Sequence, residues 1–331
     1  MSLDLAPGVH RIEPAMYHAD LLRVVEVTLS SSLARLIVNR SPLHAWTGHP
    51  RLNPDYVSDE RKTFDIGRAA HRAVLGAGGD YAAYPPEVLA SNGAASTKDA
   101  KAWAEEQRAN GVTPLKADEV DQIGAMAHAV RRKLTAMGIS FDPTRSELTA
   151  LGRVDGVWCR AMLDNAPEDP RQPLYDLKST EDASPEAVIR AVVNYSYEVQ
   201  AAHYLATWKA ATGEDRRFRF VFVEKSPPYE VAVVELYAAP VGASPDGPEM
   251  AADWMLTAHS KAAEARRLWG ECLAADRWPG YPAEIAQIGA PGWYAQKWAD
   301  RPRAEPIIVK KPNAETLARA RAWQAPMEAA E

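Results

Sequence analysis

Two aspartates and a lysine near the middle of the chain are residues that a metal-dependent phosphodiester hydrolase needs. Asp164 ends the run CRAMLD, and Asp176 and Lys178 lie in the next run, LYDLKST. Residues two apart in a strand project from the same face, so Asp176 and Lys178 should point together. Two carboxylates can hold a hard divalent cation, and a lysine beside them can orient a water whose pKa the metal lowers. The apolar neighbours Leu174 and Leu177 predict that this run lies in a sheet. Charged residues are rare on the inner face of a sheet, so Asp176 and Lys178 there indicate a function.

Four further residues could complete such a site. Gln200 and Tyr204 are four apart and share one helical face, from which an amide and a phenol can reach a phosphate or an attacking water. His71 follows Gly67 by four residues in GRAAH, and a neutral imidazole can join a carboxylate metal site. Glu147 stands at the start of a predicted strand and can supply another oxygen. Each residue taken singly is more often structural, so the prediction depends on the whole set.

Asp155 competes with Asp164 for the same role, because the run GRVDG also places an aspartate at the end of a strand. Asp155 and Gly156 stand between two β-type runs, which is a strong hairpin signal and gives Asp155 a structural role. Only one short loop separates Asp164 from Asp176, so adjacent strands can present both carboxylates at one end. We therefore favour Asp164.

The order of predicted elements indicates how these residues are positioned. We expect strands at 21–27, 147–154, 157–163, 174–178, 218–223 and 230–236, and helices at 33–40, 64–75, 98–109, 117–137, 197–211 and 250–275, with a helical region opening at 184–186. This order predicts an α/β fold with a mixed central β-sheet flanked by helices. We expect a single domain over 1–331, with a mainly helical part at 1–140, the catalytic sheet and helix at 141–240, and a helical part at 241–331.

The composition excludes several classes of protein. Of the 331 residues, 47% are hydrophobic and 25% are charged, as in ordinary globular proteins. No apolar run is long enough to cross a bilayer, and the start MSLDLAPGVHRIEP does not resemble a secretory signal. We therefore expect a cytoplasmic protein with no membrane partner. Two cysteines are too few for a disulfide framework or a four-cysteine metal site, and the net charge of −6 argues against nonspecific coating of nucleic acid.

Taken in order, the motifs match a known arrangement. A helical Gly-x-x-x-His, a Glu on the first strand, an Asp, an Asp-x-Lys and a helical Gln-x-x-x-Tyr resemble the PD-(D/E)XK nucleases. The stretches VWCR, DLKST, YEVQAAHY and FVFV are similar to the exonuclease VIII (RecE-type) and RecB-like nuclease domains, over roughly residues 30–300. One departure is the sequence Met162-Leu163-Asp164, where the family more often has Pro-Asp.

The resemblance implies both a mechanism and partners. It implies a PD-(D/E)XK core that hydrolyses linear double-stranded DNA with Mg²⁺, for which Mn²⁺ substitutes. The expected polarity is 5′-to-3′, and the product is single strands for phage-style DNA recombination. The expected partners are double-stranded DNA ends, a RecT-type single-strand annealing protein and further copies of the chain in a ring-like homo-oligomer. The implied metal ligands are His71, Asp164 and Asp176, and the implied catalytic residues are Glu147, Asp164, Asp176, Lys178, Gln200 and Tyr204.

Three alternatives share parts of this pattern. A CRISPR-adaptation nuclease has the same motifs, but that family usually holds an iron–sulfur cluster with four cysteines, whereas this chain has two. A non-catalytic DNA-binding or assembly protein with a decayed nuclease fold would show erosion at the metal positions, which are all retained here. A hydrolase of another phosphate substrate could use the same metal.

Overall fold

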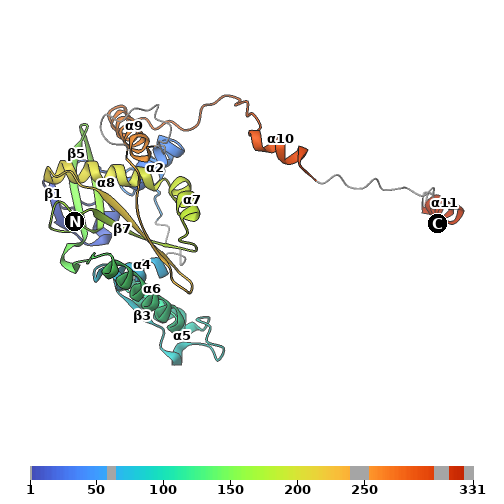
Figure 1. Cartoon of the computed structure of the whole chain (residues 1–331), viewed down its shortest axis with the longest axis horizontal. Helices are drawn as coiled ribbons and strands as arrows, with labels where there is room; N and C mark the ends of the chain where they lie inside the picture. The colour runs from blue at the N-terminus through green and yellow to red at the C-terminus, as the bar shows by residue number, and fades with distance from the viewer. Residues whose placement is uncertain (1, 58–64, 239–252, 302–312, 324–331) are drawn as a thin grey trace. The chain divides into compact units, whose positions relative to one another are not determined.

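The computed structural model describes residues 2–57, 65–238, 253–301 and 313–323. The chain divides into two compact units, Met1–Tyr281 and Pro282–Glu331, and the larger sheet lies entirely in the first unit (Figure 1). The single nuclease domain over 1–331 stays a prediction.

The predicted hairpin is confirmed. Strands β5 (Ser146–Val154) and β6 (Val157–Asn165) pair antiparallel, and Val154 pairs with Val157 across a two-residue turn. Asp155 has φ +50° and Gly156 has φ +80°, as a hairpin turn with two left-handed central residues requires. The Asp-Gly dipeptide suits this turn because aspartate tolerates the left-handed region and glycine has no side chain to oppose it.

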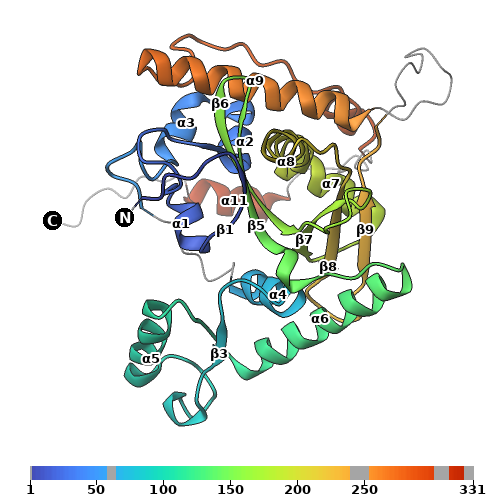
Figure 2. The ribbon, with the colours of Figure 1, turned by 90° about the vertical axis from the view of Figure 1, so that its left-hand side faces the viewer.

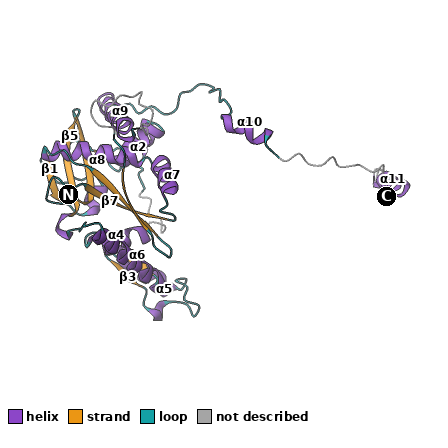
Figure 3. Ribbon diagram, viewed as in Figure 1, coloured by secondary structure: helices purple, strands orange, loops and turns teal. Residues whose placement is uncertain are grey.

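The hairpin is the centre of a seven-stranded mixed sheet. Its order is β1 (Gly8–Arg11), β5, β6, β7 (Leu174–Thr180), β8 (Phe218–Glu224) and β9 (Val231–Glu235), and β2 (Leu29–Ser30) also pairs with β6. The β7–β8 and β2–β6 pairs are parallel and the others antiparallel. The predicted mixed α/β sheet flanked by helices is therefore confirmed (Figure 3).

Helices cover both faces of this sheet (Figure 2). Phe218, Phe220 and Phe222 of β8 pack into a core with α7 (Pro185–Tyr195) and α8 (Tyr197–Thr212). The alternate residues Val221 and Val223 pack on the other face with α4 (Asp65–Leu75) and α6 (Ala117–Ala136). Helix α8 has apolar residues all round because α2 (Ser31–Asn39) and α9 (Trp254–Ala275) cover its outer side.

The smaller elements complete both units. In the first unit they are α1 (Pro14–His18), α3 (Pro42–Thr47), β3 (Tyr81–Ala83), η2 (Pro86–Val88), α5 (Lys98–Ala109), β4 (Thr113–Leu115) and η3 (Pro143–Arg145). The second unit contains α10 (Gly292–Ala299) and α11 (Ala314–Trp323). Position 64 and positions 250–252 of the predicted helices lie outside the described residues. Within the described residues, no helix has the length and apolar character needed to cross a membrane.

The predicted strand at 21–27 is wrong. The segment forms turns, and its residues Val24 and Val25 are 56% and 82% exposed. Leu3 and Leu5 donate to the carbonyl oxygens of Leu21 and Leu22. The Arg51 guanidinium donates to the carbonyl oxygens of Arg23, Val24 and Glu26 at 2.8–2.9 Å. The β-branched run therefore satisfies its backbone without joining a sheet.

Candidate active site

The backbone of Leu177 fixes two of the predicted residues where β6 meets β7. In the described residues these strands pair at one position, Asn165 with Tyr175. Beyond it, the Leu177 N–H donates to Asp164 Oδ2 at 2.5 Å, and the Leu177 carbonyl lies 2.9 Å from Nε2 of His71 on α4. Asp164 and His71 are thus held beside the strand that carries Asp176 and Lys178.

Asp176 has a partner on each carboxylate oxygen. Gln200 Nε2, on α8, donates to Asp176 Oδ1 at 2.7 Å, and Lys178 Nζ lies 2.6 Å from Asp176 Oδ2. Asp176 and Gln200 are buried, so the amide and the ammonium fix the orientation of the carboxylate. The structure therefore brings together Asp176, Lys178 and Gln200 as the sequence predicts.

The buried carboxylates of Asp164 and Asp176 shift the pKa values of their neighbours. Burial, followed by the charge of Asp176, raises the pKa of Asp164 well above its usual range. Burial acts to lower the pKa of Lys178, but Asp176 and other negative groups outweigh it, so the net Lys178 pKa is raised. Lys178 is therefore protonated in this structure and stabilises the negative charge of Asp176.

His71 turns a lone pair toward Asp164. A carbonyl oxygen can only accept, so the contact with Leu177 places the proton of His71 on Nε2. Burial is the largest influence on His71 and lowers its pKa, which keeps the ring neutral. The bare Nδ1 then lies 3.6 Å from Asp164 Oδ2. Two electron-pair donors facing each other at this distance suit a shared cation.

Glu147 belongs to the same cluster. It stands between the pairs Ser146–Asn165 and Leu148–Leu163, which places it opposite Asp164 in register. Its backbone has φ +50°, a left-handed conformation that costs a non-glycine residue about 1 kcal/mol. Burial, and then the charge of Asp164, raises the Glu147 pKa.

A glycine makes room for the Glu147 side chain. A Cβ added at Gly78, whose φ is +102°, would lie 2.6 Å from Glu147 Oε1. No other residue type fits there without moving the carboxylate. Gly78 is therefore a part of the site that the sequence analysis missed, and the signal available was weak because several glycines lie in that loop.

Tyr204 lies one helical turn after Gln200 but packs into the core. Its ring meets Phe218 edge-on at 5.9 Å, and the residue is 7% exposed. Burial, then Tyr17 and the two aspartates, raises its pKa, and the Ser31 side chain acts in the opposite direction. Within the described residues no hydrogen bond joins it to either aspartate, so the structure does not bring Tyr204 into the cluster as directly as Gln200.

Tyr197 contacts the cluster although the sequence analysis gave it no role. The Nζ atom of Lys178 lies 4.9 Å from the centre of its ring, a cation–π contact. The ring also contacts Phe220, with ring centres 5.6 Å apart and planes tilted by 33°. Tyr197 precedes Gln200 by three residues, so both side chains lie on the same face of α8. That spacing was the signal available in the sequence.

The competing aspartate lies elsewhere. Asp155 forms an ion pair with Arg266 of α9 at 2.8 Å, at the turn of the hairpin. Val157 lies just after that turn, and seven residue-to-residue steps along the strand, about 23 Å, lead from it to Asp164. Asp155 is therefore not part of the cluster.

The donor groups fit a hard divalent cation. Asp164, Asp176 and Glu147 offer carboxylate oxygens, and His71 offers a bare nitrogen. Within the described part of the chain, no three His, Cys, Asp or Glu side chains stand ready to hold a metal in their present positions. In the present arrangement Lys178 Nζ lies 2.6 Å from Asp176 Oδ2. The donor chemistry fits a cation that would share Asp176 with, or take it from, the ammonium.

Comparison with known proteins supports the same fold. Residues 47–281 match the family described as "PDDEXK-like domain of unknown function (DUF3799)". The fold is similar to a crystal structure of a "Putative exonuclease" from Eubacterium rectale, with a TM-score of 0.53 and 12% identity over 90% of this chain and 96% of that one. At that identity the likeness shows the fold alone. No curated protein matches the chain.

Proposed function

The chain belongs to this PDDEXK-like family, and from that premise we propose that it is a Mg²⁺-dependent exodeoxyribonuclease acting on linear double-stranded DNA. The family and the fold support a nuclease. The observation that carries the proposal is that Asp176, next to Asp164, accepts a hydrogen bond from Gln200 and forms an ion pair with Lys178. That arrangement is suited to phosphodiester hydrolysis and has no evident structural purpose in a buried part of a sheet.

Each residue has a part that follows from its contacts. Asp164 and Asp176 would hold the cation, with His71 Nδ1 as a further donor and Glu147 as an outer carboxylate. Gln200 fixes Asp176 Oδ1, and the cation would share Oδ2 with the Lys178 ammonium or displace the ammonium from it. When bound, Mg²⁺ or Mn²⁺ would lower the pKa of a water and neutralise charge on the phosphate.

Lys178 acts on the scissile phosphate in this proposal. Its raised pKa keeps it charged at neutral pH, so its ammonium can stabilise the charge that develops on the phosphate and orient the attacking water. Tyr197 limits where the ammonium can move, because its ring lies against Nζ.

The finer activity rests on the resemblance to exonuclease VIII nucleases. We propose digestion from double-stranded DNA ends, 5′-to-3′, to expose single strands for recombination. A RecT-type annealing protein and a homo-oligomer are the corresponding proposed partners.

Digestion of end-labelled DNA tests the proposal. We expect linear duplex to be degraded with Mg²⁺ or Mn²⁺, and no degradation in EDTA. Equal digestion of closed circular and linear duplex would show that the enzyme needs no DNA end. That result would reject exonuclease activity but not nuclease activity. Activity that needs no divalent cation would reject the metal mechanism.

A further inference from the structure

The outer strand β9 presents an unpaired edge. It ends the strand order of the sheet, and no described residue pairs with its other side. The backbone carbonyl oxygen of Glu230 accepts from the N–H of Glu224, on the preceding strand, at 3.0 Å, so the backbone of Glu230 faces inward. Because neighbouring residues in an antiparallel strand turn their N–H and C=O groups in opposite directions, Val231, Val233 and Glu235 direct these groups outward.

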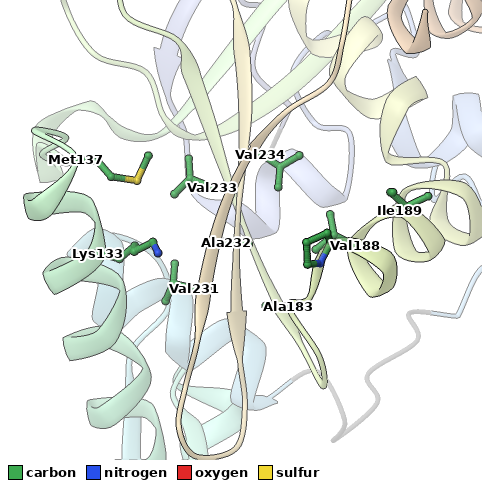
Figure 4. A pocket seen from close by; sticks show the side chains of 10 residues that line it. Lys133, Met137, Ala183, Val188, Ile189, Val231, Ala232, Val233 and Val234 are labelled. Carbon is green, nitrogen blue, oxygen red and sulfur yellow. The ribbon is translucent and has the colours of Figure 1, made fainter. Parts of the chain in front are cut away.

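An apolar groove of about 530 Å³ straddles this edge (Figure 4). Lys133 and Met137, at the end of α6, flank one side, and Val188 and Ile189 of α7 flank the other. Met137 is 47% exposed and Ile189 is 54% exposed, which leaves large apolar side chains in water on both sides of the strand.

Strand β9 lacks the features that usually protect an edge. Its sequence is Val-Ala-Val-Val-Glu, with no proline and no lysine. Its only charge is Glu235 at the end of the strand, and apolar edge strands with so little protection tend to pair with other chains. The edge and the groove together therefore suit an added strand.

We propose that β9 pairs antiparallel with β9 of a second copy of this chain, about a two-fold axis at Val233. In this register Val233 faces its own counterpart, and Val231 faces Glu235 of the second copy. All three residues with outward backbone groups then bond to one another, which joins two sheets into one. The exposed Met137 and Ile189 would be covered by the same contact.

Charge complementarity favours a second copy as the occupant. Lys133 is exposed and lies beside Val231 (Figure 4). Val231 and Glu235 are four apart in the strand and share a face, so Glu235 of the second copy would lie on the same side as Lys133. Glu235 lies 2.7 Å from Arg219 and 3.7 Å from Arg217 of its own chain, and its side chain is 36% exposed, so its carboxylate can accept Lys133 as a further partner. The pairing would thus add an ion pair at each end of the joined strands.

The test measures the mass of the full-length chain in solution by light scattering. We expect twice 36.3 kDa, or a larger even multiple. Val233→Pro removes an outward N–H, which an edge strand tolerates, and should halve the mass. Val233→Thr keeps the N–H and should leave the mass unchanged. Circular dichroism checks that both variants are folded.

A second variant does not alter the strand at all. Lys133→Glu places like charges at the seam and should weaken association at least tenfold, while Lys133→Arg should not. A monomeric wild-type chain would overturn the proposal, and so would Lys133→Glu with unchanged association. The inference specifies one interface of the proposed homo-oligomer and does not depend on the proposed nuclease activity, because neither position belongs to the active-site cluster.

Discussion

His71 and Asp164 face each other across 3.6 Å, and the backbone of one residue, Leu177, holds both. The imidazole is neutral and turns a lone pair toward the carboxylate, whose pKa burial and Asp176 raise well above its usual range. Such a contact is unfavourable unless a proton or a cation lies between the two groups. The raised pKa of Asp164 favours a proton there when no metal is bound, and a divalent cation can take the same place.

Replacing His71 tests its part in holding the cation. His71→Ala should raise the Mg²⁺ concentration for half-maximal cleavage by about 10–100-fold, as loss of a ligand or of its support does elsewhere. His128→Ala, at an exposed position of α6, is the matched control. An unchanged Mg²⁺ requirement in both variants would remove His71 from the metal site.

Lys178→Ala should slow cleavage severely and yet increase the stabilisation of the protein by metal. The ammonium and a cation compete for Asp176 Oδ2, which lies 2.6 Å from Nζ. Loss of charge stabilisation at the phosphate should cost about 10²–10³ in rate, while Mg²⁺ should raise the melting temperature more than in the wild type. Lys225→Ala, which removes an ion pair with exposed Glu181, should change neither quantity. A smaller Mg²⁺ effect on the variant than on the wild type would contradict the competition.

The sequence was most informative where local chemistry determines the structure. Asp155 and Gly156 predict their turn because the left-handed conformation limits the choice of residue. Gln200 could be predicted as a site residue because its helix follows the Asp176 strand in the order of motifs along the chain. The predicted strand at 21–27 failed because Arg51, a distant residue, satisfies that backbone.

Other features required the tertiary structure. Leu177 acts through its backbone, so no residue type signals its role in holding Asp164 and His71. The room that Gly78 leaves for Glu147 depends on a contact between a loop and a strand far apart in the sequence. Tyr197 could have been found from its spacing to Gln200, but its contact with Lys178 could not.

Two glycine substitutions test the placement of Glu147. Gly78→Ala should lower the free energy of unfolding by about 2 kcal/mol and should also reduce cleavage, because its Cβ would displace the Glu147 carboxylate. Gly93→Ala has a similar backbone, with φ +75° and nothing within 4 Å, so it should lose about 1 kcal/mol and keep its activity. Urea unfolding and DNA cleavage measure both effects. Equal losses of stability and of cleavage in the two variants would contradict the position of the Glu147 carboxylate beside Gly78.

The thiol of Cys159 gives a test of burial through its pH dependence. Burial raises its pKa to about 12, so at pH 8 the thiolate fraction is about 10⁻⁴, against about a tenth for a thiol of pKa 9. Native protein should therefore react with iodoacetamide at Cys159 about a thousandfold more slowly than unfolded protein, and raising the pH to 10 should still leave the native thiol mostly protonated. Rapid native labelling, located by mass spectrometry, would show that this part of β6 is not buried.

The central claim is that Asp164, and not Asp155, helps to hold the catalytic cation. The most direct measurement is the rate of linear duplex degradation at saturating Mg²⁺ for Asp164→Asn and Asp155→Asn side by side. Both substitutions are nearly isosteric. Asn-Gly supports the same turn as Asp-Gly, while a neutral amide is a poor replacement for a charged ligand. We predict an active Asp155 variant and an Asp164 variant that has lost nearly all activity; an inactive Asp155 variant beside an active Asp164 variant would contradict the proposed site.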